Sequence, residues 1–178
     1  LSNVQPSDAG LYKVVVSNAA GSAASAEVRL TVIVPVSITA QPKSQTLVAG
    51  QTATFQVTAA GTEPIAYQWQ FNGANILGAT NSAFSLQPLA LSHSGSYTVV
   101  VSNAGGTLTS APAQLTVNTP IAITAQPQSQ TVVAGTNATF TVAADGSGPI
   151  SYQWLLNGFA LAGATAREVT LTNVQPSL

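Results

Sequence analysis

The stretch YTVVVSN, residues 97–103, decides the fold class because its twin YKVVVSN, residues 12–18, lies 85 residues earlier in the chain. In both copies a Tyr and two Val residues occupy alternate positions, which is the pattern of a strand with one buried face. An alternating stretch that recurs at a fixed distance predicts a tandem array of β-domains.

The same spacing of 85 residues relates the other motifs of the chain without a gap. These pairs are SITAQP at 37–42 and AITAQP at 122–127, YQW at 67–69 and 152–154, and NG at 72–73 and 157–158. The opening LSNVQPSD and the closing LTNVQPSL stand at one position of the repeat. The chain therefore comprises two periods and eight further residues.

Turn signals separate the alternating runs within one period. Asn72-Gly73 indicates a two-residue hairpin, because a type I′ turn needs positive φ at both central residues. Ala49-Gly50 and the segment 103–106 supply further turns, and no stretch keeps an apolar period of 3.6 residues. About seven short strands per period indicate an all-β chain of β-sandwiches.

The composition excludes several classes of function. Charged residues make up 5% of the chain and nearly cancel to a net charge of −1, so no basic patch exists to bind nucleic acid. The absence of Cys excludes disulfides and thiolate zinc sites, and no stretch is apolar enough to insert in a membrane. We expect no cofactor. Without Met or a signal-peptide pattern at its start, the chain is expected to be an internal piece of a longer, exported polypeptide.

Three features together resemble the immunoglobulin fold, closest to the I-set type, in the tandem form of large bacterial surface proteins. They are Trp69 twelve residues after Val57, the stretch DAGLYKV at 8–14, and the loop SNAG at 102–105. The resemblance implies a core Trp, a tyrosine corner, and valines at the positions of the family's two cysteines. The structural core it implies is Tyr12, Val14, Val57, Trp69, Tyr97, Val99, Val142 and Trp154.

On this template residues 1–34 are the end of one domain (strands F and G), residues 35–118 are a complete domain, and residues 119–178 supply strands A to E of another. The short links Val34-Pro35 and Thr119-Pro120 predict a semi-rigid rod. The incomplete ends expose apolar faces and sheet edges. Either the native chain continues, or another copy completes them as a homopolymer. We favour the first, because the repeated eight residues would compete for one position.

No residue pattern indicates catalysis or a metal. His93 stands between two serines without a carboxylate nearby, so we interpret it as a loop residue. The loop 145–148 lacks the Lys and the helix of a phosphate-binding loop, and the sequon at Asn137 is interpreted as a chance match. Leu155 and Phe159 replace a Gln and an Ala of the preceding repeat and form a candidate contact patch.

The sequence therefore predicts a structural segment of an extracellular or cell-surface bacterial repeat protein, forming a rod, stalk or filament. Its expected partners are neighbouring domains of the same kind, in the same or another copy. The alternative is an adhesive module that binds a carbohydrate or a protein through its loops. No residue supports an enzyme.

Overall fold

The computed structural model describes residues 1–176 and confirms the all-β fold class. Apart from two single turns of 3-10 helix, every regular element within these residues is a strand. None of the helical turns found there is long and apolar enough to cross a membrane. The last two residues of the predicted third domain, 177 and 178, lie outside the described residues.

The chain forms two compact units. The first contains Leu1–Gln45, Thr52–Gln87 and Ser94–Leu115. The second contains Thr46–Gln51, Pro88–His93 and the chain from Thr116 onwards. We call residues 1–34, 35–118 and 119–176 the first, middle and third segments.

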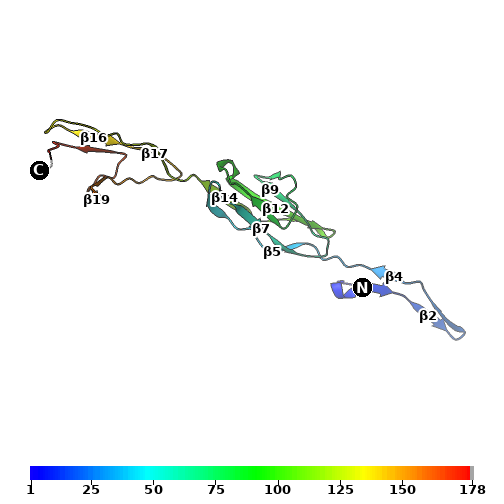
Figure 1. Ribbon diagram of the computed structural model, residues 1–178. Coiled ribbons are helices and arrows are strands. Elements are labelled where there is room, and N and C mark those ends of the chain that lie inside the picture. The colour runs from blue at the N-terminus through cyan, green and yellow to red at the C-terminus, as the bar shows by residue number, and fades with distance from the viewer. Residues whose placement is uncertain (177–178) are drawn as a thin grey trace. The chain divides into compact units, whose positions relative to one another are not determined.

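The middle segment is a two-layered sandwich (Figure 1). One sheet has the order β10-β9-β12-β14-β6, with β13 also paired to β12. Its strands are β6 (Gln45–Val48), β9 (Ala66–Phe71), β10 (Ala74–Asn75), β12 (Gly95–Asn103), β13 (Gly106–Thr109) and β14 (Ala113–Asn118). The facing layer pairs β5 (Ser37–Ala40) with β8 (Thr58–Ala60), and β7 (Ala53–Gln56) with β11 (Ala83–Leu86). The turn η2 (Leu91–His93) precedes β12.

Alternation along the strands builds the core of the middle segment. Along β7 the apolar residues Ala53 and Phe55 are buried, whereas the threonine and glutamine between and after them are exposed. From the opposite sheet Tyr97 stacks on Phe55 with ring centroids 4.7 Å apart, and Trp69 lies 6.0 Å from Phe55. The buried Trp69 indole donates a hydrogen bond to the Asn81 carbonyl at 2.9 Å, so its polar atom is satisfied in the core.

The first segment contains one long, irregular hairpin after the turn η1 (Pro6–Asp8). Its strands are β1 (Gly10–Tyr12), β2 (Val15–Asn18), β3 (Gly21–Ala24) and β4 (Val28–Leu30). β1 pairs with β4 and β2 with β3, in the same register that joins β12 to β14 and β13 in the middle segment. Because no second sheet covers the hairpin in this segment, its residues 11–29 are all exposed.

The third segment contains the counterparts of the first part of the sandwich. Its strands are β15 (Ala122–Ala125), β16 (Ala138–Thr141), β17 (Ala143–Asp145), β18 (Leu155–Leu156), β19 (Phe159–Ala160) and β20 (Glu168–Leu171). They pair as β15–β17, β16–β20 and β18–β19. Residues 151–154 are not a strand, although their counterparts lie in β9. In the middle segment β9 pairs with β12, and the described part of the third segment has no counterpart of β12.

Candidate functional site

Four of the predicted core residues lie together inside the middle sandwich. Val57, Trp69, Tyr97 and Val99 are each exposed by 2% or less. Burial raises the pKa of the Tyr97 phenol, because the charged phenolate loses its hydration there. The two valines at the family's cysteine positions are therefore part of an apolar core that holds without a covalent bridge.

The other four predicted core residues lie in the incomplete segments and are less covered. Tyr12 is 40% exposed and Val14 is 57% exposed, because the hairpin of the first segment has no facing sheet. Val142 and Trp154 are half-buried. The Tyr12 hydroxyl nevertheless donates a hydrogen bond to the Asp8 carbonyl at 2.6 Å. The bond of the tyrosine corner is therefore present even where no facing sheet covers the tyrosine.

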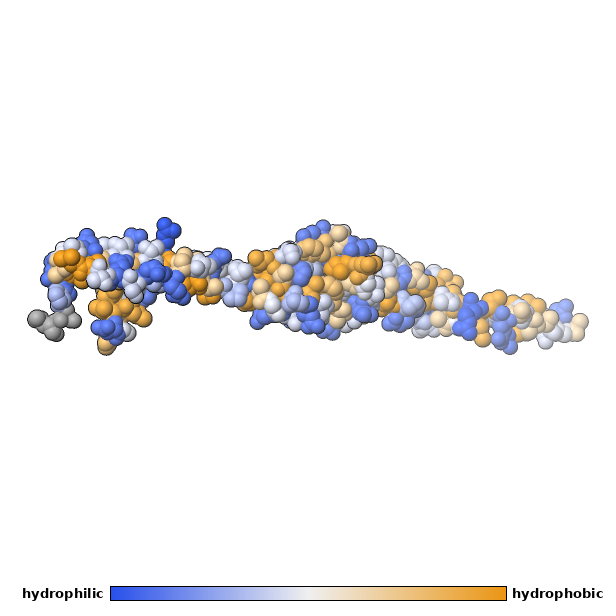
Figure 2. Space-filling model, turned by 45° about the horizontal axis from the view of Figure 1, so that its top comes forward, coloured by the Kyte–Doolittle hydropathy of each residue, from blue (hydrophilic) through white to orange (hydrophobic). Residues whose placement is uncertain are grey.

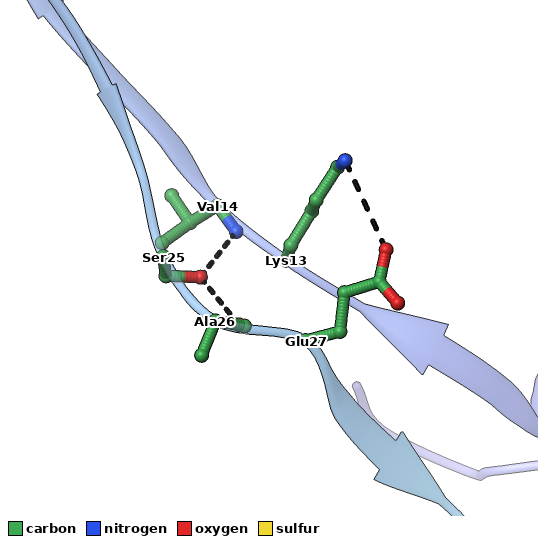
Figure 3. Close-up of polar contacts among 5 residues, drawn as sticks. All are labelled: Lys13, Val14, Ser25, Ala26 and Glu27. Atoms are coloured by element: carbon green, nitrogen blue, oxygen red, sulfur yellow. Dashed lines mark hydrogen bonds and ion pairs between the residues drawn. The ribbon is translucent and has the colours of Figure 1, made fainter.

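A serine fixes the irregular point of this hairpin (Figure 3). The Val14 amide donates to Ser25 Oγ at 3.1 Å, and the Ser25 hydroxyl donates to the Ala26 carbonyl at 2.8 Å. Beside it, Lys13 and Glu27 form an exposed ion pair at 3.8 Å, whose contribution to stability is small. In the middle segment Ser110 makes the same two bonds, to Val99 and Ala111, in a buried setting.

His93 is part of a turn. Its Nδ1 accepts a hydrogen bond from the Ala90 amide at 3.0 Å. In the first segment the Asp8 carboxylate accepts the equivalent bond from the Gln5 amide at 2.7 Å. The imidazole therefore replaces a carboxylate as the acceptor that closes the turn before the tyrosine corner.

The hairpin β18–β19 carries the predicted contact patch, and hydrophobic residues gather on it in Figure 2. Leu155 is 61% exposed and Phe159 is 80% exposed. The register places Phe159 opposite Leu156 and Leu155 opposite Ala160. Since directly opposed residues share a face, Phe159 lies on the side of Leu156, and the structure does not bring Leu155 and Phe159 onto one face.

A cluster that the sequence reasoning missed lies where the chain enters the middle segment. Val34, the residue before Pro35, makes a reciprocal pair of bonds with Thr62: its amide donates to Thr62 Oγ1 at 2.8 Å, and the Thr62 amide donates to the Val34 carbonyl at 3.0 Å. The Asn103 side-chain amide donates to the carbonyls of both residues, at 2.8 and 3.0 Å. We call Val34, Thr62 and Asn103 the first linker anchor.

The entry to the third segment repeats this arrangement 85 residues later. The Thr119 amide donates to Ser147 Oγ at 2.7 Å, and the Ser147 amide donates to the Thr119 carbonyl at 3.2 Å. The two hydroxyls also lie 3.0 Å apart. We call Thr119 and Ser147 the second linker anchor. Thr62 and Ser147 stand at the same position of the repeat, and both carry a hydroxyl group. This recurrence is the sequence signal that could have indicated the anchors.

Glycines permit the close approach at both anchors. A Cβ on Gly61 would lie 3.1 Å from the Val36 Cα, and one on Gly146 would lie 3.0 Å from the Ile121 Cα. A Cβ on Gly105, beside Asn103, would lie 2.8 Å from the Pro35 Cα. Each proline link is therefore held by side-chain hydrogen bonds and by backbone packed against it, and not by the proline alone.

The remaining candidates have local structural partners. Asn137 Oδ1 accepts a hydrogen bond from the Asn173 amide at 3.2 Å, and Asp145 Oδ1 accepts one from the Gly146 amide at 2.8 Å within its loop. In the part of the chain that the structure describes, no three His, Cys, Asp or Glu side chains gather to hold a metal.

Comparison with known proteins identifies the sandwich. Residues 35–103 match the model of the immunoglobulin domain family. An I-band fragment of titin superposes with a TM-score of 0.79 at 20% identity, covering 97% of this chain and 67% of that one. This likeness confirms the fold class, which is that of tandem immunoglobulin-like sandwiches.

Two relatives come from different organisms, one from a mammal and one from a bacterium. The basement membrane-specific heparan sulfate proteoglycan core protein of Mus musculus is 28% identical over 187 residues, which is 100% of this chain and 5% of that protein. Endoglucanase C of Cellulomonas fimi is 36% identical over 120 residues, which is 64% of this chain and 11% of that protein. The chain spans only 5% to 14% of the length of the first six curated relatives that it matches.

Proposed function

Because the chain is built from tandem immunoglobulin-like domains, we propose that it is a structural segment of an extracellular or cell-surface bacterial repeat protein that forms a rod, stalk or filament. The two linker anchors carry this proposal. A domain array transmits length and direction only if its links resist bending, and the residue before the proline of each link makes the same reciprocal pair of hydrogen bonds. The proposed role requires no catalysis.

The domain division belongs to this proposal. Residues 1–34 are the F and G part of one domain, residues 35–118 are a complete domain, and residues 119–178 are the A to E part of the next. Support comes from the register of the first hairpin, which repeats that of the complete domain, and from the anchors at both proposed boundaries. The partners are then neighbouring immunoglobulin-like domains, in the same chain or in another copy as a homopolymer.

Extracellular and bacterial placement rests on two kinds of observation. One relative is named as a basement-membrane protein, and another belongs to the bacterium Cellulomonas fimi. Charged residues also make up only 5% of the chain, so its surface consists mainly of neutral side chains. Sedimentation of the native polypeptide with the cell-surface fraction of its host supports this placement, and recovery in the cytosol contradicts it.

The first linker anchor can be tested by removing its hydroxyl. Thr62→Val keeps the shape but deletes the acceptor for the Val34 amide, so hydrogen exchange at Val34 should accelerate by about tenfold, the loss of roughly one net hydrogen bond. Thr54→Val is the matched control, because it removes a surface hydroxyl bond between two strands, to Ser85, and leaves the link intact. Equal exchange at Val34 in the parent and in Thr62→Val would contradict the anchor.

A second candidate function is adhesion through a carbohydrate or protein ligand. The observation that favours it is Phe159, an aromatic ring that is 80% exposed in a chain related to part of an endoglucanase. Cosedimentation with insoluble cellulose tests it. Retention that Phe159→Ala abolishes supports adhesion, and no retention of the parent chain rejects this ligand.

A further inference from the structure

A polar groove lies on the surface of the middle segment, where β5 ends and β6 begins. β5 pairs with β8 in one layer and β6 pairs with β14 in the other, so the chain crosses between the layers at residues 41–44. Pro42, which is buried in this crossing, has no amide hydrogen with which to pair a strand. Within the described residues β7 pairs with β11 alone, and the space on its other side is a groove of about 570 Å³.

Alternation along β7 and β8 gives the groove a floor of three polar side chains, which are Thr54, Gln56 and Thr58. All three are exposed, whereas Phe55 and Val57 between them are buried in the core. The floor therefore presents hydroxyl and amide groups on a strand whose other face is fixed by packing.

The backbone of Gln56 adds a donor and an acceptor to this floor. The Val57 amide donates to the Ser82 carbonyl at 3.0 Å, on the side of β11. Because successive residues of a strand direct their N–H and C=O groups to opposite sides, those of Gln56 face the groove. The Thr54 carbonyl faces the same side and accepts a bond from Gln45 Nε2 at 2.9 Å, which closes one end of the groove.

Side chains of the wall are held in place by hydrogen bonds of their own. Gln41 Oε1 accepts a bond from the Ala111 amide, and Ser44 Oγ accepts one from the Gln114 amide, both at 2.9 Å. Each bond leaves a second polar group for a ligand: the amide nitrogen of Gln41, the hydroxyl hydrogen of Ser44 and the side-chain oxygen of Gln45. Because these side chains are already ordered, a ligand that binds them loses less conformational entropy.

The equivalent positions of the third segment differ in the groups that a ligand would contact. Thr141 and Ala143 stand where the middle segment has Gln56 and Thr58. The Thr141 hydroxyl donates to Glu168 Oε2 at 3.3 Å, whereas the residue opposite Gln56 is an alanine, which offers no such partner. The available polar groups are therefore a property of the middle segment and not of every repeat.

We propose that this groove binds a neutral, hydroxyl-rich saccharide, with Gln56 and Thr58 as its main contacts. A sugar hydroxyl both donates and accepts hydrogen bonds, which matches the mixed donors and acceptors of the floor and the wall. Lys43 is the one charged residue among those that line the groove, so the floor offers a charged ligand no ionic partner. The proposal rests on the second candidate function, adhesion, and names a site and a ligand class for it.

An extended peptide fits the groove less well than a saccharide. Strand addition needs a row of unpaired backbone groups, and β7 is only four residues long, with Gln45 already bound to its edge. No aromatic side chain lines the groove, so ring stacking does not add to the affinity. We therefore expect a weak saccharide complex, with a Kd in the millimolar range.

Nuclear magnetic resonance titration of the ¹⁵N-labelled 178-residue chain tests the proposal. The probes are soluble hexasaccharides of glucose, mannose and xylose at millimolar concentration, with oligogalacturonate as the acidic comparison. Amide signals of residues 40–45 and 54–58 should shift with a neutral probe. Those of the equivalent residues 125–130 and 139–143 should stay unchanged.

Substitutions of the floor show whether its polar groups bind the probe. Gln56→Ala with Thr58→Val should weaken binding by about fivefold or more, the loss of at least one net hydrogen bond. Gln114→Ala with Thr116→Val is the matched control, because it changes the same residue types at alternate, exposed positions of β14. All four side chains are exposed, so the sandwich stays folded, and its near-ultraviolet spectrum provides the check.

Every outcome of the titration decides something. Groove shifts that the floor substitutions weaken and the control keeps support the proposal. Equal binding by the two variants, or shifts with the acidic probe alone that Lys43→Gln abolishes, overturns it. Shifts confined to residues 155–160 overturn the groove but leave adhesion through Phe159 standing. No shift with any probe rejects the groove and saccharide adhesion together, and leaves the linker anchors and the proposed spacer untouched.

Discussion

The hairpin of residues 10–30 and its counterpart, residues 95–115, share more than half of their residues, their strand register and the hydrogen bonds of one serine, but their surroundings are opposite. Tyr12 and Val14 face solvent, whereas Tyr97 and Val99 are in the core. The register, the serine bond and the turn are therefore encoded locally, within about twenty residues. Burial is not, because it needs the facing strands that only the middle segment provides.

The largest effect expected from this contrast is at the two tryptophans. Trp69→Ala should destabilise the middle segment by about 3–5 kcal/mol, because it leaves a cavity in a closed core. Trp154→Ala should cost the third segment less than half of this, since Trp154 is already half-exposed and its neighbours can relax. Urea unfolding followed by nuclear magnetic resonance of each segment measures both. Equal losses would show that the third segment is closed in solution.

An intermediate effect is expected at the paired serines. Ser110→Ala leaves the buried Val99 amide without its acceptor, which should lower the free energy of unfolding by about 1–3 kcal/mol. Ser25→Ala exposes the Val14 amide to water, so the change should stay within about 0.5 kcal/mol. Urea unfolding of the two variants beside the parent gives both values. A cost at Ser25 equal to that at Ser110 would contradict the difference in burial.

The smallest effect concerns the turn before each hairpin. His93→Asp installs the acceptor of the first segment, so the middle segment should keep its stability within about 0.5 kcal/mol. His93→Ala removes the acceptor and should cost about 1 kcal/mol. Thermal unfolding of the two variants compares them directly. If the alanine and aspartate variants are equally stable, the imidazole bond contributes nothing.

Sequence reasoning predicted the elements of the fold that depend on alternation and repetition. The period of 85 residues, the inward Trp69 and Tyr97, and the β-sandwich all follow from side-chain pattern. The exposure of Leu156 does not follow from the pattern. Its side chain is on the face that becomes buried only when a strand like β12 covers it.

The linker anchors were also beyond the sequence pattern. Val34 and Thr62 are joined across 28 residues, and Val34 and Asn103 across 69, so neither contact leaves a local signature. What the sequence offered was indirect: Thr62 and Ser147 are both hydroxyl residues, and Gly61 and Gly146 both precede them. A loop residue of one chemical type that recurs at the period of a tandem array can therefore indicate a junction between domains.

The proposed stiffness of the links between domains is tested most directly by backbone ¹⁵N relaxation of the chain. The account predicts that amides of β7 and β8 and amides of β16 and β17 report one shared tumbling time, as expected of segments joined by an anchored link. Separate and shorter tumbling times for the two groups of amides would contradict it and would make the chain a string of independent domains.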